Sequence, residues 1–292
     1  MKQQKVLSPL RDKEYGGAWS IHDIESVNFI KNIHIKQGNR KKFLTEYKDW
    51  IQEGKKFSGL ENYKHVDFSA GTTETFMNFY IGHLDKRLRL YKGEYFFHWL
   101  VARNYFNNVL VLDHNDIAKG DVVVMSCPFS NTGNIPENFY SILDRCEALQ
   151  VPVMLDMAYI NISNIQELNL EYKCIEVICT SLSKVFPVEH NRIGIRLRQN
   201  FYDDTLFAYN ENNYVNLQSI HIGHELIKKF KNNWLYDKYK NMQSDECKKL
   251  GLDTSSCVIF GLDKNNKYPE YERGTKVNRL CFSRKWDRRI IL

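Results

Sequence analysis

Two stretches in the middle of the chain decide the fold: VPVMLDMAY at residues 151–159 and IEVICTSLSK at residues 175–184. Each begins with apolar, largely β-branched residues and ends in polar residues that include Asp156 and Lys184. Short, continuously apolar runs are typical of strands buried on both faces of a parallel sheet. Ligands of open α/β sheets bind at the carboxyl ends of the strands. The polar residues that follow these two runs are therefore the first candidates for a functional site.

Similar runs continue on both sides of these stretches and predict further strands. They lie at residues 66–69, 109–112, 122–125 and 193–197. The segments between them have the character of helices: residues 94–106 are rich in aromatic side chains, and residues 136–149 begin with Pro136, which suits a first helical position. The alternation predicts an α/β fold with a mostly parallel sheet flanked by helices.

The ends of the chain carry different patterns. Residues 40–53 form an amphipathic helix candidate with Phe43, Tyr47 and Trp50 on one face. Residues 217–242 are predicted to form one long helix, and residues 257–262 and 277–282 to form strands of a small, shortened α+β unit. We therefore expect an N-terminal arm at residues 1–38, a large α/β domain at residues 39–200 and a small domain at residues 201–292.

Composition narrows the class of protein. The 292 residues are 43% hydrophobic, enough for a large core, and the net charge is +6. The basic clusters are short and dispersed, which argues against a nucleic-acid partner. No run of 18 apolar residues predicts a membrane span, and residues 1–10 lack the apolar centre of a signal peptide.

The cysteines and histidines do not predict a metal site. The seven cysteines are scattered, and the pair Cys174 and Cys179 does not have the spacing of a metal-binding knuckle. They indicate reduced thiols in a cytoplasmic protein. His221 and His224 lie three apart, unlike the His-Glu-x-x-His order of zinc peptidases, and a polar helix face explains them.

Three groups of polar residues follow predicted strands. Thr72 and Thr73 follow a glycine at a helix start, where backbone amides can bind an anion, although a simple helix cap would look the same. Asp156 could contact a ligand or cap a loop. Lys184 lies between two predicted buried strands; burial would lower its pKa and make it a usable nucleophile, whereas on an exposed loop it would be an ordinary surface lysine.

Taken in order, these residues resemble a known signature. Asp156-Met157-Ala158-Tyr159, then Ser181-x-x-Lys184, then Arg192-Ile193-Gly194 is similar to the pattern of the fold type I pyridoxal-phosphate enzymes, the aspartate-aminotransferase-like family. The turn at residues 71–74 lies where that family binds the cofactor phosphate. The resemblance extends from about residue 65 to residue 198 and is faint beyond.

The resemblance implies a role for each matching residue, with pyridoxal 5'-phosphate as cofactor. Lys184 would form the Schiff base with the cofactor aldehyde and later transfer the substrate Cα proton. Asp156 would pair with the protonated pyridine nitrogen and so keep the ring an electron sink. Tyr159 would donate to the ring hydroxylate.

The remaining cofactor contacts are implied in the same way. The phosphate would be held by Thr72, Thr73, Ser181 and Arg192, with Ser183 as a further contact. An aromatic residue should stack on the ring; Tyr95 has the expected spacing, and Phe96, Phe97 and Trp99 are alternatives.

The chain departs from the family pattern in one motif. Where the family has Asn-Pro-Thr-Gly, this sequence has Ser130-Asn131-Thr132-Gly133. Ser130 therefore stands in the place of the asparagine that bonds the ring hydroxylate, unless Asn131 reaches in instead. Both are expected near the cofactor.

The resemblance also implies an arginine for the substrate carboxylate on a strand near the C-terminus. Arg279 is the candidate; Arg273 and Arg284 are alternatives, and a surface charge on an edge strand is the competing interpretation.

These expectations favour an aminotransferase that acts on an α-amino acid and a 2-oxo acid and forms a homodimer. The alternative is another pyridoxal-phosphate reaction at Cα: a decarboxylation, an elimination, or an oxidative or cyclising step. A binding protein on a degenerate scaffold is a third hypothesis, and the presence of Lys184, Asp156 and Arg192 argues against it.

Overall fold

A seven-stranded sheet forms the centre of the molecule. The computed structural model describes residue 10 and residues 12–286. The strand order is β2-β9-β8-β6-β5-β3-β4. These strands are β2 (His65–Ser69), β3 (Arg87–Leu90), β4 (Val109–Val111), β5 (Asp121–Ser126), β6 (Val153–Asp156), β8 (Ile175–Ser181) and β9 (Gly194–Arg198). All neighbours pair in parallel except β9, which runs antiparallel to both β8 and β2. The expected α/β class with a mostly parallel sheet is confirmed.

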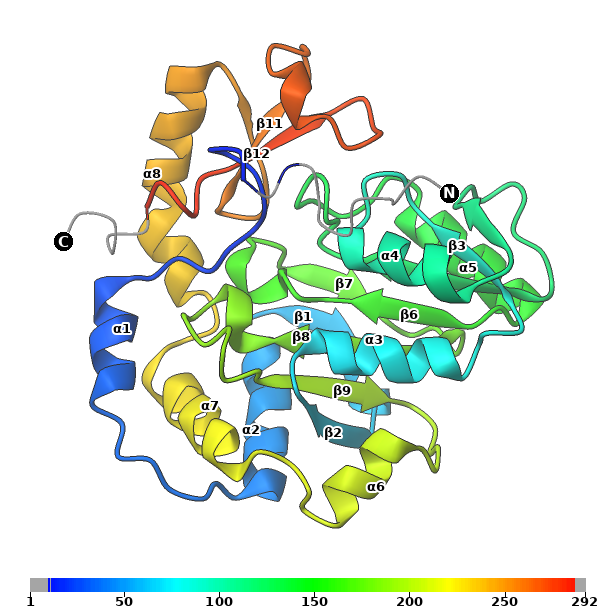
Figure 1. The fold of residues 1–292 in the computed structure, drawn as a ribbon, viewed down its shortest axis with the longest axis horizontal. Helices are drawn as coiled ribbons and strands as arrows, with labels where there is room; N and C mark the ends of the chain where they lie inside the picture. The colour runs from blue at the N-terminus through cyan, green and yellow to red at the C-terminus, as the bar shows by residue number, and fades with distance from the viewer. Residues whose placement is uncertain (1–9, 11, 287–292) are drawn as a thin grey trace.

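Helices cover both faces of the sheet (Figure 1). The bounds of these helices are α2 (Arg40–Ile51), α3 (Thr72–Ile81), α4 (Phe96–Tyr105), α5 (Phe139–Leu149), α6 (Thr205–Glu211) and α7 (Leu217–Lys229). Along β5, Val123 packs in a core with α2, α5 and α7, whereas the next residue, Val124, packs in a second core with α3 and α4. Because successive side chains of a strand point to opposite faces, continuous apolar runs bury both faces of the sheet.

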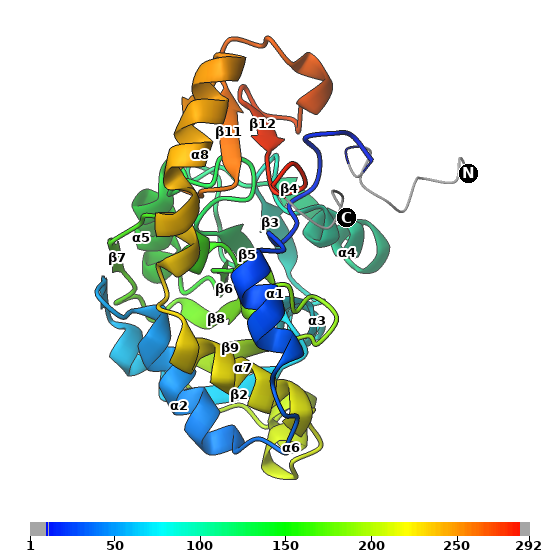
Figure 2. The same ribbon diagram turned by 90° about the vertical axis from the view of Figure 1, so that its left-hand side faces the viewer.

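The C-terminal part forms a smaller unit against one end of the sheet (Figure 2). It consists of α8 (Trp234–Leu250) and an antiparallel sheet in the order β10-β11-β12. Its strands are β10 (Asp253–Thr254), β11 (Phe260–Asp263) and β12 (Asn278–Cys281). The N-terminal segment before α1 (Ile24–Lys31) passes beside β12, where Cys281 N donates to Tyr15 O at 2.9 Å. The division into an arm and two domains stays a prediction.

Short elements complete the chain. They are β1 (Lys56–Ser58), which pairs in parallel with β7 (Glu167–Asn169), and the 3-10 turns η1 (Leu60–Asn62), η2 (Ile160–Ile162), η3 (Leu182–Lys184) and η4 (Pro269–Tyr271). Within the described residues, no helix combines the length and the apolar character that a membrane crossing requires.

Two details of the predicted helices were wrong. The single helix expected at residues 217–242 is divided between α7 and α8 at Phe230. The break is held by α2 and the turn that follows it, because Trp50 Nε1 donates to Phe230 O at 2.7 Å and Asn232 Nδ2 donates to Glu53 O at 2.9 Å. Pro136 does not open a helix either: α5 begins at Phe139, after Asn138 in the left-handed region at φ 59°.

Candidate active site

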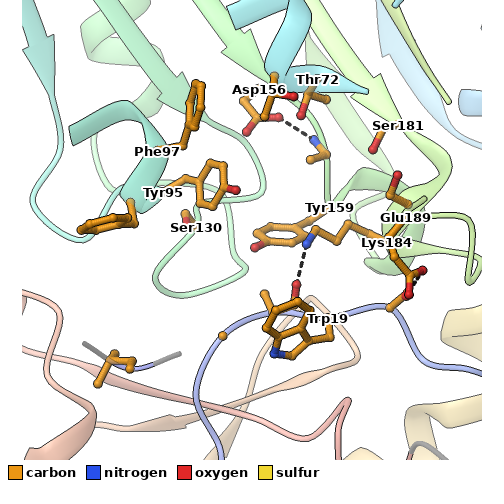
Figure 3. Close-up of a pocket in the computed structure, with 18 of the residues that line it drawn as sticks. Trp19, Thr72, Tyr95, Phe97, Ser130, Asp156, Tyr159, Ser181, Lys184 and Glu189 are labelled. Atoms are coloured by element: carbon orange, nitrogen blue, oxygen red, sulfur yellow. Dashed lines mark hydrogen bonds between the residues drawn. The ribbon is translucent and has the colours of Figure 1, made fainter. Parts of the chain in front are cut away.

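A cavity of about 480 Å³ lies between the carboxyl ends of β6 and β8 on one side and the N-terminal segment and the small unit on the other (Figure 3). That volume is in the range of small-molecule and cofactor sites. The structure brings eleven of the twelve predicted site residues to its walls: Thr72, Thr73, Tyr95, Ser130, Asp156, Tyr159, Ser181, Ser183, Lys184, Arg192 and Arg279. Their individual roles stay predictions.

Lys184 lies in the cavity because η3 turns directly after β8. Its Nζ donates to Ala18 O of the N-terminal segment and lies 5.7 Å from the ring centroid of Tyr159. Burial lowers the pKa of Lys184 to about 8, assisted by the positive charge of Arg279 and opposed by Asp156. The side chain is therefore an amine with a substantial neutral fraction near neutral pH, as a nucleophile requires.

Asp156 is the last residue of β6, and neighbouring groups hold its carboxylate in place. Its Oδ1 accepts from Ala158 N at 2.9 Å, and His98 Nε2 lies 3.8 Å from Oδ2. His98 is fully buried, and its Nδ1 is 2.7 Å from the hydroxyl of Tyr80. The carboxylate can therefore face the cavity in a fixed orientation. Neither His98 nor Tyr80 was predicted, because a histidine in an aromatic helix gives no signal of its own.

One end of the cavity is shaped to receive an anion. Gly71 caps α3 at φ 76°, and a Cβ there would lie 2.3 Å from the Arg192 guanidinium. Only glycine therefore allows Arg192 to reach Thr73, whose Oγ1 accepts from Arg192 Nη2 at 2.9 Å. The hydroxyl of Ser183 is buried with no partner among the described residues. A helix N-terminus, an arginine and an unpaired hydroxyl together favour a bound phosphate or carboxylate.

Aromatic side chains form another wall. Tyr95 precedes α4 and lies 6.2 Å from the ring of Phe97, nearly parallel to it. Phe96 and Phe97 also line the cavity, whereas Trp99 is not among the lining residues. The choice of the stacking residue among Tyr95, Phe96 and Phe97 stays open.

Asn131 is the predicted site residue that the structure does not bring to the cavity. Its Nδ2 donates to Thr275 Oγ1 at 2.7 Å and to Val277 O at 2.9 Å, so the side chain ties its turn to the segment before β12. Ser130 lines the cavity instead.

Two arginines enter the cavity from the small unit. Arg279 is buried on β12; it donates to Ser130 O and Gly17 O, and its guanidinium lies 4.4 Å from the ring centroid of Phe260. Arg273 donates to backbone carbonyls and to Ser130 Oγ. Within the part of the chain that the structure describes, neither guanidinium has a carboxylate partner.

The third candidate, Arg284, stacks on Trp19 at 4.9 Å and does not line the cavity. The interpretation of Arg279 as an exposed edge charge is wrong, because its side chain is only 4% exposed.

The N-terminal segment supplies cavity residues that could not be assigned from the sequence. Gly17, Ala18 and Trp19 line the cavity, and Glu189 opposite them accepts from Ser20 Oγ at 3.1 Å and lies 2.8 Å from His22 Nε2. The segment is thereby tied to the loop that follows Lys184. No sequence pattern marks this contact.

The two histidines that lie three residues apart, His221 and His224, make structural contacts. His224 Nε2 lies 2.6 Å from Glu46 Oε2, and His221 Nε2 lies 3.1 Å from His34 O. Among residue 10 and residues 12–286, no three His, Cys, Asp or Glu side chains cluster in a way that could hold a metal ion.

The described residues fit pyridoxal 5'-phosphate. A low-pKa amine, a buried carboxylate, an aromatic wall and an anion-binding end with an unpaired hydroxyl surround one cavity. These are the four kinds of contact that an aldehyde, a pyridine nitrogen, a flat ring and a phosphate require.

Comparison with known proteins gives the same result. Residues 85–219 match the family model "Aminotransferase class I and II". A PLP-bound C-S lyase from Staphylococcus hominis superposes with a TM-score of 0.64 at 12% identity, over 94% of this chain and 85% of that one. This protein has the fold of the type I pyridoxal-phosphate enzymes. The expected resemblance, the transferase-like enzyme class and the cofactor agree with these findings.

Other fold type I structures carry out different reactions. Tyrosine aminotransferase from Leishmania infantum has a TM-score of 0.64 at 12% identity, over 92% of this chain and 88% of that one. L-threonine-O-3-phosphate decarboxylase from Porphyromonas gingivalis has a TM-score of 0.59 at 13% identity, over 90% and 94%. No curated protein matches the chain in sequence. At these identities the likeness concerns the fold, and the reaction must be argued from the site.

Proposed function

We propose that this protein is a pyridoxal-phosphate-dependent aminotransferase that exchanges the amino group between an α-amino acid and a 2-oxo acid. The observation that carries the proposal is the position of Lys184: an amine with a pKa near 8 lies in a cavity that also contains Asp156, Tyr159 and an anion-binding end. The match of residues 85–219 to the aminotransferase family supports the same reaction class.

Lys184 and Asp156 have different roles in the proposed reaction. When bound, the cofactor supplies an aldehyde and an electron-withdrawing pyridinium ring. Lys184 Nζ would hold the aldehyde and would serve as the base that takes the substrate Cα proton and returns it. Asp156, fixed by Ala158 N and with His98 Nε2 3.8 Å from its Oδ2, would pair with the pyridine nitrogen of the cofactor and so favour its protonated form.

The two ends of the cavity would fix the reactants. Thr72, Thr73, Ser181, Ser183 and Arg192 surround the anion-binding end and would hold the cofactor phosphate. At the opposite side the guanidinium of Arg279, with Nε buried and without a partner among the described residues, would bind the substrate α-carboxylate. Tyr95 and Tyr159 would orient the ring between these ends.

We further propose a cytoplasmic homodimer in which the cavity lies near the subunit interface. C2 dimers are the commonest symmetric oligomers. Sedimentation at micromolar concentration tests this: a dimer is expected, and a fully active monomer would contradict it.

Transamination is tested by mixing the purified holoprotein with single amino acids and recording the visible spectrum. An amino donor should shift the absorbance to that of the pyridoxamine form, and a 2-oxo acid should reverse the shift. Release of carbon dioxide or ammonia without this reversible change would instead establish the second candidate, a decarboxylase or lyase. The same fold is found in a C-S lyase and a decarboxylase, so the spectrum and the released products decide between these reactions.

A further inference from the structure

Three residues of the N-terminal segment, Gly17, Ala18 and Trp19, pass beside the two groups that the proposed function assigns to the substrate. Arg279 Nη2 donates to Gly17 O at 2.6 Å, and Lys184 Nζ donates to Ala18 O. The α-carboxylate of the substrate would bind Arg279 and its Cα proton would pass to Lys184, so the substrate Cα has to lie beside this segment. Trp19 is the next residue along the chain, and it lines the same cavity. It is therefore placed to contact the side chain that extends from Cα.

Trp19 is held in place although 41% of it is exposed. Its N donates to Ser283 Oγ at 3.2 Å, and Cζ of Arg284 lies 4.9 Å from its ring centroid. Gly17 has φ 77°, and a Cβ there would lie 2.5 Å from Trp19 Nε1, so glycine lets the indole fold back against the segment. Trp19 belongs to neither hydrophobic core of the described residues. A fixed, partly exposed indole outside the core presents an apolar surface to the cavity.

Helix α4 supplies the opposite wall. Phe96, Phe97 and Leu100 line the cavity, and Figure 3 shows Phe97 and Trp19 on opposite sides of it. Phe96 and Leu100 are four residues apart and so share one face of the helix. Neither of these two belongs to a hydrophobic core of the described residues, whereas Phe97 packs against one. Phe96 and Leu100 therefore keep apolar surface that a ligand can cover.

The charged side chains that line the cavity are engaged elsewhere. Those with a part in the proposed function are Asp156, Lys184, Arg192 and Arg279. Glu189 lies 2.8 Å from His22 Nε2. Arg273 Nη2 donates to Gly93 O at 3.0 Å and to Glu94 O at 3.2 Å. Among the described residues, the cavity lining that the N-terminal segment and α4 supply contains no charged group that could receive a charged substrate side chain.

The chemistry of the two walls favours one class of substrate. A charged side chain between them would lose its hydration without gaining a partner. An aromatic ring buries a large apolar area and can pack edge or face against the rings of Trp19 and Phe96. We propose that the amino-acid substrate has an aromatic side chain, and that Trp19, with Phe96 and Leu100 opposite, is the specificity-determining residue that receives it. The inference rests on the proposed function, because Lys184 and Arg279 fix where the substrate Cα lies.

Binding is tested with three carboxylic acids that lack the amino group and therefore cannot react. They are 3-phenylpropionate, propionate and glutarate, which correspond to phenylalanine, alanine and glutamate without the amine. The dissociation constant of each acid from the holoprotein is measured by titration calorimetry. 3-Phenylpropionate should bind about 10- to 100-fold more tightly than propionate, because it buries one aromatic ring. Glutarate should bind no more tightly than propionate.

Variants of both walls locate the preference, measured as the ratio of the dissociation constants of propionate and 3-phenylpropionate. Trp19→Ala should reduce this ratio by about 10-fold and leave the affinity for propionate nearly unchanged, because Arg279 still binds the carboxylate. Trp19→Phe should retain most of the ratio. The matched control is Trp99→Ala, since Trp99 is a partly buried tryptophan of α4 that does not line the cavity, and the ratio should not move.

A second variant covers the case in which Trp19→Ala does not fold. Leu100→Ala on the opposite wall then decides, with an expected loss of about 3- to 10-fold in the same ratio. An unchanged ratio in Leu100→Ala would count against the inference in the same way as in Trp19→Ala.

The inference and the proposed function fail in different ways. Equal binding of 3-phenylpropionate and propionate would overturn the inference, and so would a ratio that Trp19→Ala leaves unchanged. Tightest binding of glutarate would also overturn it and would assign Arg273 to a second carboxylate of the substrate. If no amino acid of any class changes the visible spectrum of the holoprotein, the proposed function itself is contradicted and the inference falls with it.

Discussion

The lowered pKa of Lys184 has a measurable consequence for the reactivity of the apoprotein. An exposed lysine has a pKa of 10.5, and burial brings that of Lys184 to about 8. At pH 7 a difference of this size makes the neutral amine roughly 300-fold more abundant than on an exposed lysine. The amine should therefore react with an acylating reagent far below the pH at which surface lysines do.

The assay is competitive labelling of the apoprotein with a trace of acetic anhydride between pH 6 and 11, with mass spectrometry of each lysine peptide. The labelling of Lys184 should rise with a midpoint near pH 8. Lys248, exposed on α8, serves as the internal reference. Asp156→Asn should move the midpoint of Lys184 lower, because the negative charge of Asp156 raises the lysine pKa.

The reasoning would be refuted by a Lys184 midpoint at pH 10 or above. It would also be refuted by an upward shift in Asp156→Asn, since removing a nearby negative charge must disfavour the protonated amine.

Other predictions concern the acids and the arginine around the site. Asp156→Ala should remove most turnover with the fold intact, and Asp156→Glu should retain more, as steady-state rates and circular dichroism will show; equal rates in both and in wild type would exclude a role of Asp156 in the reaction. Arg279→Lys should raise KM for the amino acid by roughly 30- to 1,000-fold, because a lysine cannot form the bidentate pair; an unchanged KM would exclude the role. Glu94 is fully buried, and burial raises its pKa to about 7. Its folded pKa is above the unfolded value of 4.5, so its contribution to stability is complete below pH 4.5 and is lost as pH rises through 7. Glu94→Gln should therefore gain up to about 3 kcal/mol over wild type at pH 8 and little at pH 4.5 in urea unfolding, and equal gains at both pH values would contradict this.

The strands of the large sheet could be predicted from the sequence where they are continuous apolar runs. Every apolar run expected as a strand of the large sheet is one. Helices cover both faces of the central strands, whereas β4 lies at the sheet edge and leaves Leu110 and Val111 exposed. β3 was missed: its sequence alternates arginine and leucine and looks like a basic surface cluster. In the fold Arg89 is buried, and its Nε donates to Asp121 Oδ2 at 2.9 Å. A charge paired across neighbouring strands cannot be anticipated from one strand alone.

The site was predictable where one motif positions one residue. Asp156 and Lys184 follow strands directly, so the carboxyl edge of the sheet brings them together. The sequence could not show that the side chain of Asn131 lies outside the cavity, because its partners, Thr275 and Val277, come from a segment more than 140 residues away. The contribution of Ala18 depends in the same way on long-range packing of the N-terminal segment.

The central claim is that Lys184 is the amine that binds pyridoxal 5'-phosphate, and one measurement tests it most directly. The holoprotein is reduced with borohydride, which fixes the cofactor to the amine that holds it, then digested and mapped by mass spectrometry. The account predicts a single pyridoxyl modification on Lys184 and none in Lys184→Ala. A modification on another lysine, or an unlabelled protein after incubation with excess cofactor, would contradict it.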